Sequence, residues 1–130
     1  MRILHLANQV PETSDSNTFT GHARLTRMTG LSNDFEVNAY RVEFDQEART
    51  AWHVHSGPQL LIVLDGHCRL QRKGEPIQKL VSGDIACIAA GERHWHGASP
   101  DIAMTHIAIN INSTTTWLEK VTDTEYNGST

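Results

Sequence analysis

The chain has 130 residues, which is the usual size of one domain and enough to bury a hydrophobic core without disulfide bonds. Its formal net charge is -4, and its acidic and basic residues are mixed along the sequence. Because no basic patch is interleaved with aromatic residues, the composition argues against nucleic acid as a partner.

The first 18 residues differ in character from the rest of the chain. Their only apolar run, residues 3–7, is short and is interrupted by His5, so it predicts neither a signal peptide nor a membrane span. The tract at residues 11–17 is polar and indicates an arm or a loop. We therefore expect an N-terminal arm over residues 1–18 and a single domain over residues 19–130.

Most of the domain is predicted to consist of short strands separated by turns. Residues 35–44 alternate with period two, and Asp65-Gly66 is a strong hairpin signal. Residues 19–33 show no clean period and are expected to form a short strand and loop. The frequent turns predict an all-β sandwich or barrel. Besides residues 35–44 and the histidine-bearing strands, the expected strands are 59–64, 67–71, 77–81, 85–89 and 102–112.

The C-terminal tail has a different pattern. Thr116 and Glu119 have the spacing of a capping box, which predicts a short helix from Trp117 to about Thr122.

The two cysteines, Cys68 and Cys87, have no motif spacing and lie in apolar, strand-like runs. They are expected to be buried free thiols, as is typical of a reducing compartment. Together with the lack of a targeting or membrane segment, this predicts a cytoplasmic protein.

Two of the expected strands are apolar on both faces, so a lone sandwich would leave one apolar face in water. Exposed contiguous apolar surface usually marks an interface, and we therefore predict a homodimer. The alternative is that the N-terminal arm or the C-terminal helix covers this face. The outward residues are Leu60, Ile62, Leu64, Ile107, Ile109 and Ile111.

Two His-x-His pairs carry most of the chemical information. Residues two apart on a strand point to the same face, so His53 projects with His55 and His94 with His96. After a Gly-Pro turn, Gln59 opens the next strand and can bring a further side chain to the same place. Imidazole is the commonest neutral metal ligand, so the pairs favour a metal site over surface or ordinary core histidines.

These residues resemble the two motifs of the cupin family. The first motif appears with glutamine in place of the usual glutamate, and the second has alanine where many members carry proline. The resemblance implies a small β-barrel, the double-stranded β-helix of jelly-roll type. The matching positions are His53, His55, Gln59 and Gly66 for the first motif, and Gly83, Ala89, Gly91 and His94 for the second.

A narrower resemblance is to the small single-domain bacterial cupins associated with carboxymuconolactone decarboxylase. It is carried by the segments 49–53, 94–98 and 104–108 and by the tail at 117–123. Some similar cupins are manganese-dependent hydroxynitrile lyases, and these also have glutamine at the position of Gln59.

The resemblance implies that the metal ligands are His53, His55, Gln59 and His94. Three imidazoles and one amide oxygen carry no charge, so a divalent ion would keep its full charge and be a strong Lewis acid. Four protein ligands leave two open positions on an octahedral ion. One ion per chain is expected, and Mn²⁺, Fe²⁺, Co²⁺, Ni²⁺ and Zn²⁺ all remain open.

Other inward-facing residues are expected to complete the site. His106 and His96 are predicted to be catalytic, because a histidine near a metal can act as a general acid or base; the alternative is a structural hydrogen-bonding role. The predicted substrate pocket is largely apolar and suits a small molecule. It consists of Tyr40, Val42, Phe44, Thr50, Leu61, Met104 and Asn110.

The resemblance favours a metal-dependent lyase that acts at a carbonyl or cyanohydrin carbon. Two alternatives stay open: an iron-dependent dioxygenase with the same ligands, and a non-enzymatic module that binds a small molecule or a metal as a sensor or accessory protein. The fold cannot decide among them, because one fold hosts many functions.

Overall fold

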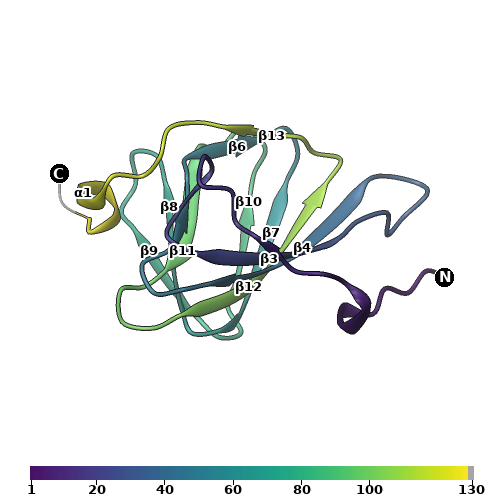
Figure 1. Cartoon of the computed structure of the whole chain (residues 1–130). Helices are drawn as coiled ribbons and strands as arrows, with labels where there is room; N and C mark the ends of the chain where they lie inside the picture. Colours follow the sequence, from purple (N-terminus) through teal and green to yellow (C-terminus); the bar gives the residue numbers. More distant parts are fainter. Residues whose placement is uncertain (129–130) are drawn as a thin grey trace.

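The computed structural model describes residues 1–128 as two antiparallel sheets that face each other (Figure 1). The first sheet has the order β1 (Glu12–Thr13), β3 (Ala23–Met28), β4 (Val37–Phe44), β12 (Met104–Ile111), β7 (Gln59–Asp65) and β10 (Ile85–Ile88). The second sheet contains β13 (Thr115–Trp117), β6 (His53–His55), β11 (His94–Ala98), β5 (Arg49–Thr50), β2 (Phe19–Thr20), β8 (His67–Arg72) and β9 (Gln78–Val81). The prediction of an all-β fold is therefore confirmed.

Strand β12 organises the first sheet, because it pairs with β4 along its whole length and with β7 on its other side. Its side chains alternate strictly: Met104, His106, Ala108 and Asn110 are buried, and the residues between them are half-buried. This alternation confirms the inward face that the sequence predicted for this strand.

The turn at Asp65-Gly66 is present, but it does not form the predicted hairpin. Strand β8 pairs with β11 and β9 in the second sheet, so the turn carries the chain from one sheet to the other. Gly66 has a φ of 78°, and a Cβ atom there would collide with the Ala103 carbonyl. The turn chemistry was therefore identified correctly, whereas the partner of the following strand is set by sheet packing.

The C-terminal helix exists, but its predicted position was wrong. Residues Thr115–Trp117 form β13, which pairs with β6, and the helix α1 begins at Asp123 and ends at Tyr126. The sequence holds a second Thr-x-x-Glu pattern, and it is this one, Thr122 with Glu125, that forms the capping box. The first pattern, Thr116 with Glu119, does not start a helix because residues Thr115–Trp117 pair with the edge of β6 instead.

The core lies between the sheets and includes Phe19, Val42, Phe44, Val63 and Met104. A second cluster lies where α1 packs on the second sheet, with Tyr126 5.7 Å from Trp95 between ring centroids. The helix therefore does not cover the first sheet.

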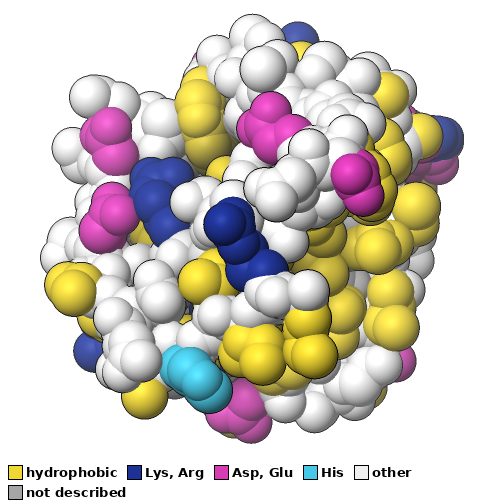
Figure 2. Space-filling model, turned by 90° about the vertical axis from the view of Figure 1, so that its right-hand side faces the viewer, with side chains coloured by type: hydrophobic (Ala, Val, Ile, Leu, Met, Phe, Trp, Pro, Cys, Tyr) yellow, Lys and Arg dark blue, Asp and Glu magenta, His cyan; other side chains and the backbone are white. Residues whose placement is uncertain are grey.

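The outer face of the first sheet carries the six apolar residues that the sequence singled out. Leu64 is 44% exposed, and its five counterparts are half-buried. Ile85 on the neighbouring β10 pairs with Ile62 and is 65% exposed. Residues 1–10, which include the 3-10 helix η1 (Leu6–Asn8), run away from the sheets before β1 joins the first sheet (Figure 1). Viewed from the side of the N-terminus, hydrophobic side chains gather in a broad band (Figure 2).

The cysteines are free thiols, as expected, but only Cys68 is buried. Cys87 is exposed because it lies on the outer face of β10 at the edge of the first sheet. No helix among residues 1–128 is both long and apolar enough to cross a membrane.

Candidate metal centre and cavity

A cavity of about 560 Å³ opens between the two sheets. Five of the predicted pocket residues line it, namely Tyr40, Val42, Phe44, Thr50 and Asn110. His53, His55, Gln59, His96 and His106 also line it, and His94 lies directly behind them, in contact with Gln59.

Leu61 and Met104 are not part of the cavity wall. Both point inward as predicted, but Leu61 packs with Ile88 and Ala108, and Met104 belongs to the main core cluster. Strand parity correctly predicts the face of a residue, but it does not say whether that part of the face borders a cavity or packed side chains.

The hydrogen bonds of the histidines fix the state of their ring nitrogens. His53 Nδ1 donates to the Ala51 carbonyl at 2.9 Å, and His94 Nδ1 donates to the Glu92 carbonyl at 2.8 Å. A carbonyl oxygen only accepts, so Nδ1 must carry the proton in both rings and Nε2 must carry a lone pair. His55 Nδ1 pairs with Thr115 Oγ1 at 2.9 Å, and its Nε2 is buried without a partner among the described residues.

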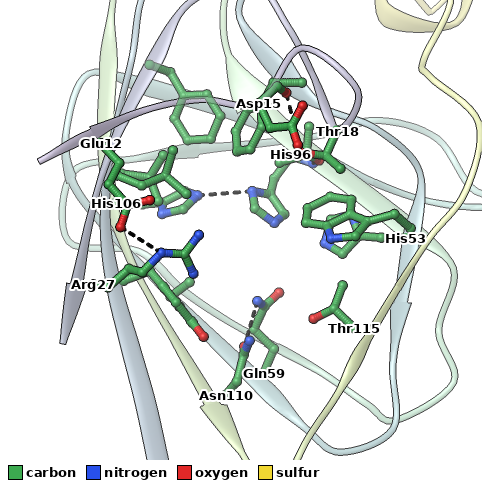
Figure 3. Close-up of a pocket in the computed structure, with 18 of the residues that line it drawn as sticks. Glu12, Asp15, Thr18, Arg27, His53, Gln59, His96, His106, Asn110 and Thr115 are labelled. Carbon is green, nitrogen blue, oxygen red and sulfur yellow. Dashed lines mark hydrogen bonds and ion pairs between the residues drawn. The ribbon is translucent and has the colours of Figure 1, made fainter. Parts of the chain in front are cut away.

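Gln59 is oriented by a neighbour. Its amide nitrogen donates to Asn110 Oδ1 at 2.8 Å (Figure 3), which leaves Oε1 as the atom that faces His94. Oε1 then lies 3.3 Å from His94 Nε2. Both atoms are acceptors with no proton between them, and such a pair is unfavourable unless a cation lies beside both. The donor set therefore fits a metal ion.

Burial keeps the histidine cluster neutral. It lowers the pKa of His53 and His96 well below 6.5, and the nearby imidazoles lower both further. Burial also lowers the pKa of His94, and it lowers those of His55 and His106 to about 4. Neutral imidazoles are the form that binds metals.

The structure offers two overlapping sets of ligands. Candidate ligand atoms of His53, His94 and His96 lie within 4.8 Å of one another. The predicted set replaces His96 with His55, whose ring centroid is 4.9 Å from that of His53, and adds Gln59. All these groups are close together, and the assignment of His55 and Gln59 as ligands stays a prediction.

His96 and His106 form a buried pair. His106 Nε2 and His96 Nδ1 are 3.0 Å apart and share one proton. Their other nitrogens, His96 Nε2 and His106 Nδ1, have no hydrogen-bond partner among residues 1–128. The pair can therefore accept a proton on one ring and pass one through the hydrogen bond between the rings.

The sequence did not single out several residues of the cavity wall. They come from the N-terminal segment, β3 and β13, and include Glu12, Asp15, Leu25, Arg27, Thr115 and Trp117. Leu25 and Arg27 lie two residues apart on β3, and both line the cavity. Glu12 pairs with β3 through β1, so part of the predicted arm contributes to the site.

Comparisons with known proteins agree with this geometry. The sequence profile of the cupin domain matches residues 40–109. The chain is 36% identical over 129 residues to an (R)-mandelonitrile lyase from Granulicella tundricola, covering 97% of this chain and 98% of that protein. A solved cupin-like protein from Thermotoga maritima is 34% identical, with a TM-score of 0.84 over 99% of this chain and 98% of the other. A polyketide cyclase from Streptomyces resistomycificus is 15% identical with a TM-score of 0.72, over 98% of this chain and 91% of the other, and is similar in fold alone.

Proposed function

Because the chain belongs to the cupin family, we propose that it is a metal-dependent lyase that acts at a carbonyl or cyanohydrin carbon of a small organic molecule. The observation that carries the metal dependence is the contact between His94 Nε2 and Gln59 Oε1, two acceptors without a proton. The lyase chemistry is supported by the similarity to an (R)-mandelonitrile lyase over almost the whole length of both chains.

We propose His53, His55, Gln59 and His94 as the ligands of one divalent ion per chain. His55 and Gln59 are preferred over His96 because they stand at the positions of the cupin motif, and because Gln59 Oε1 already lies beside the lone pair of His94 Nε2. When bound, the ion would act as a Lewis acid that stabilises negative charge on the substrate oxygen. Mn²⁺, Fe²⁺, Co²⁺, Ni²⁺ and Zn²⁺ all suit imidazole and amide ligands to different degrees.

The histidine pair is proposed to handle the proton. In cyanohydrin cleavage, the hydroxyl group loses its proton, the bond between the carbinol carbon and the nitrile carbon breaks, and cyanide leaves and takes up a proton. His106 lines the cavity and is neutral, so it can accept the hydroxyl proton, and His96 can relay it. Val42 and Phe44 give this part of the cavity an apolar wall that keeps bulk water from the reacting carbon.

The direct test is the release of benzaldehyde and cyanide from mandelonitrile. The purified protein is stripped with a chelator and reloaded with Mn²⁺, Fe²⁺ or Co²⁺, and the stripped protein is the control. Release above that control supports the proposal, and equal release refutes it. Oxygen consumption by the Fe²⁺ form with a small organic substrate would instead favour a dioxygenase.

We also propose that a second copy of the chain covers the outer face of the first sheet. On this face Leu60 lies opposite Ile109 and Ile62 opposite Ile107, so the apolar side chains form a continuous surface. The N-terminal segment exposes further large apolar residues, among them Ile3 and Val10. A two-fold dimer would bury the same patch on both chains.

A further inference from the structure

The cavity contains one basic side chain that neither metal binding nor proton transfer uses. Arg27 on β3 lies opposite Tyr40 on β4, and Leu25 lies opposite Val42. All four residues line the cavity. Arg27 is therefore part of the cavity wall, in contrast to Arg24 on the same strand, which pairs with Glu43.

The hydrogen bonds of Arg27 leave its outer edge free. Nε donates to Glu12 Oε1 at 3.0 Å, and the guanidinium carbon lies 5.7 Å from the centre of the Tyr40 ring. Within residues 1–128, the two terminal nitrogens donate no hydrogen bond. Figure 3 shows the guanidinium pointing into the open part of the cavity, across from His53 and Thr115. The two terminal nitrogens can thus donate one hydrogen bond to each oxygen of a carboxylate.

The charge of the cavity favours one anionic group. Glu12 and Asp15 are the other charged lining residues, and the lining histidines are neutral. With a divalent ion in place, these groups leave one net positive charge. The ion pair of Arg27 and Glu12 is about half exposed, with side-chain exposures of 52% and 54%, so it holds the guanidinium only weakly.

We propose that Arg27 is a carboxylate-binding group, and that the substrates it selects carry an anionic substituent at the end remote from the histidines. This inference rests on the proposed lyase function, because that function places the reacting end of the substrate at the histidines. On the first sheet Arg27 lies beside Tyr40 and His106 lies beside Val42, so an apolar stretch of the cavity wall separates the two polar groups. The preferred substrate is therefore a hydroxy or oxo compound with an apolar body and a terminal carboxylate.

The carboxylate-binding role of Arg27 is tested by measuring ligand affinity rather than catalytic turnover. Binding of 3-formylbenzoate and 4-formylbenzoate to the Mn²⁺-loaded protein is measured by calorimetry and compared with the corresponding methyl esters. A charge-assisted, two-point contact predicts that at least one carboxylate binds about tenfold or more tightly than its ester. This preference should weaken as salt is added, because part of the contact is electrostatic and exposed.

Variants test whether Arg27 is the residue that causes the preference for the carboxylate over the ester. Arg27→Gln should abolish the preference for the carboxylate, and Arg27→Lys should retain only part of it because an ammonium group lacks the planar fork. Arg24→Gln removes a similar charge from the same strand but outside the cavity, so it should keep the preference. Glu12→Gln should strengthen it, because a repelling carboxylate is removed.

The outcomes separate this inference from the lyase proposal. If neither carboxylate binds more tightly than its ester, or if Arg27→Gln retains the preference, the assignment of Arg27 is wrong. If mandelonitrile is not cleaved but the preference disappears only in the Arg27 variants, the lyase proposal fails and the carboxylate site stands.

Discussion

Acid should destabilise the metal-free protein steeply, because five buried histidines are neutral in the folded state. In the unfolded chain a histidine takes up a proton near pH 6.5. In the folded chain, burial lowers the pKa of all five, and for His55 and His106 it lowers the pKa to about 4. The unfolded state therefore binds more protons below about pH 6.5, and the free energy of unfolding must fall as the pH falls.

The size of the effect follows from the same values. Each histidine that is protonated only on unfolding removes up to about 1.4 kcal/mol per pH unit. Between the unfolded pKa and a folded pKa of about 4, His55 and His106 would each contribute on the order of 3 kcal/mol. Together these two losses approach the roughly 5–15 kcal/mol that stabilises a typical domain. The stabilisation is fully present above about pH 6.5 and is lost progressively toward pH 4.

Urea unfolding of the chelator-treated protein, followed by circular dichroism at a series of pH values, measures this slope. His106→Gln should reduce the slope by about one proton, whatever its effect on absolute stability. A free energy of unfolding that stays constant within about 1 kcal/mol from pH 7 to pH 5 would refute the reasoning.

Four further predictions concern the metal, the reaction and the assembly. His94→Ala and His55→Ala should each lose most of the co-purified metal in elemental analysis, whereas His96→Ala should keep it; metal kept by His55→Ala and lost by His96→Ala would instead make His53, His94 and His96 the ligands. Gln59→Glu should retain the metal but slow mandelonitrile cleavage, because its charge cancels part of that of the ion, and a rate equal to wild type would contradict the proposed role of the neutral ligands. His106→Ala should also retain the metal and lower the rate about a hundredfold or more through loss of a proton-transfer group; an unchanged rate would make this residue structural. Ile109→Asp should convert a dimer into monomer or aggregate in sedimentation, and a monomeric wild type would rule out the proposed interface.

Local rules predicted the parts of the fold that depend on local periodicity. Strand alternation was enough to place His53 beside His55 and to put His106 and Asn110 on one inner face. It also identified the apolar outer face of the first sheet. These predictions hold because the period of two is a property of the extended backbone itself.

The errors arose where pairing with a segment distant in the sequence determines the local structure. Thr116 satisfies the local pattern of a helix cap, but its backbone pairs with Val54, more than sixty positions earlier in the chain. Likewise, nothing within the turn at Asp65-Gly66 reveals that the next strand joins the other sheet. Arg27 was missed for a related reason: its strand shows no clean alternation, since Thr26 on the opposite face is also buried.

The unpaired nitrogens of the cluster link the function to the stability of the fold. His55 Nε2, His96 Nε2 and His106 Nδ1 are buried without partners among the described residues, and each such group costs about 1–3 kcal/mol. An apolar core of similar shape would avoid that cost, so stability alone does not explain why polar rings are placed there. A bound cation would satisfy the nitrogens that face it, and it would stabilise the folded state further because it binds the unfolded chain weakly. Metal binding should therefore raise the unfolding temperature in proportion to the logarithm of the free ion concentration, and the nitrogens of the histidine pair that stay unsatisfied are those left available to the substrate.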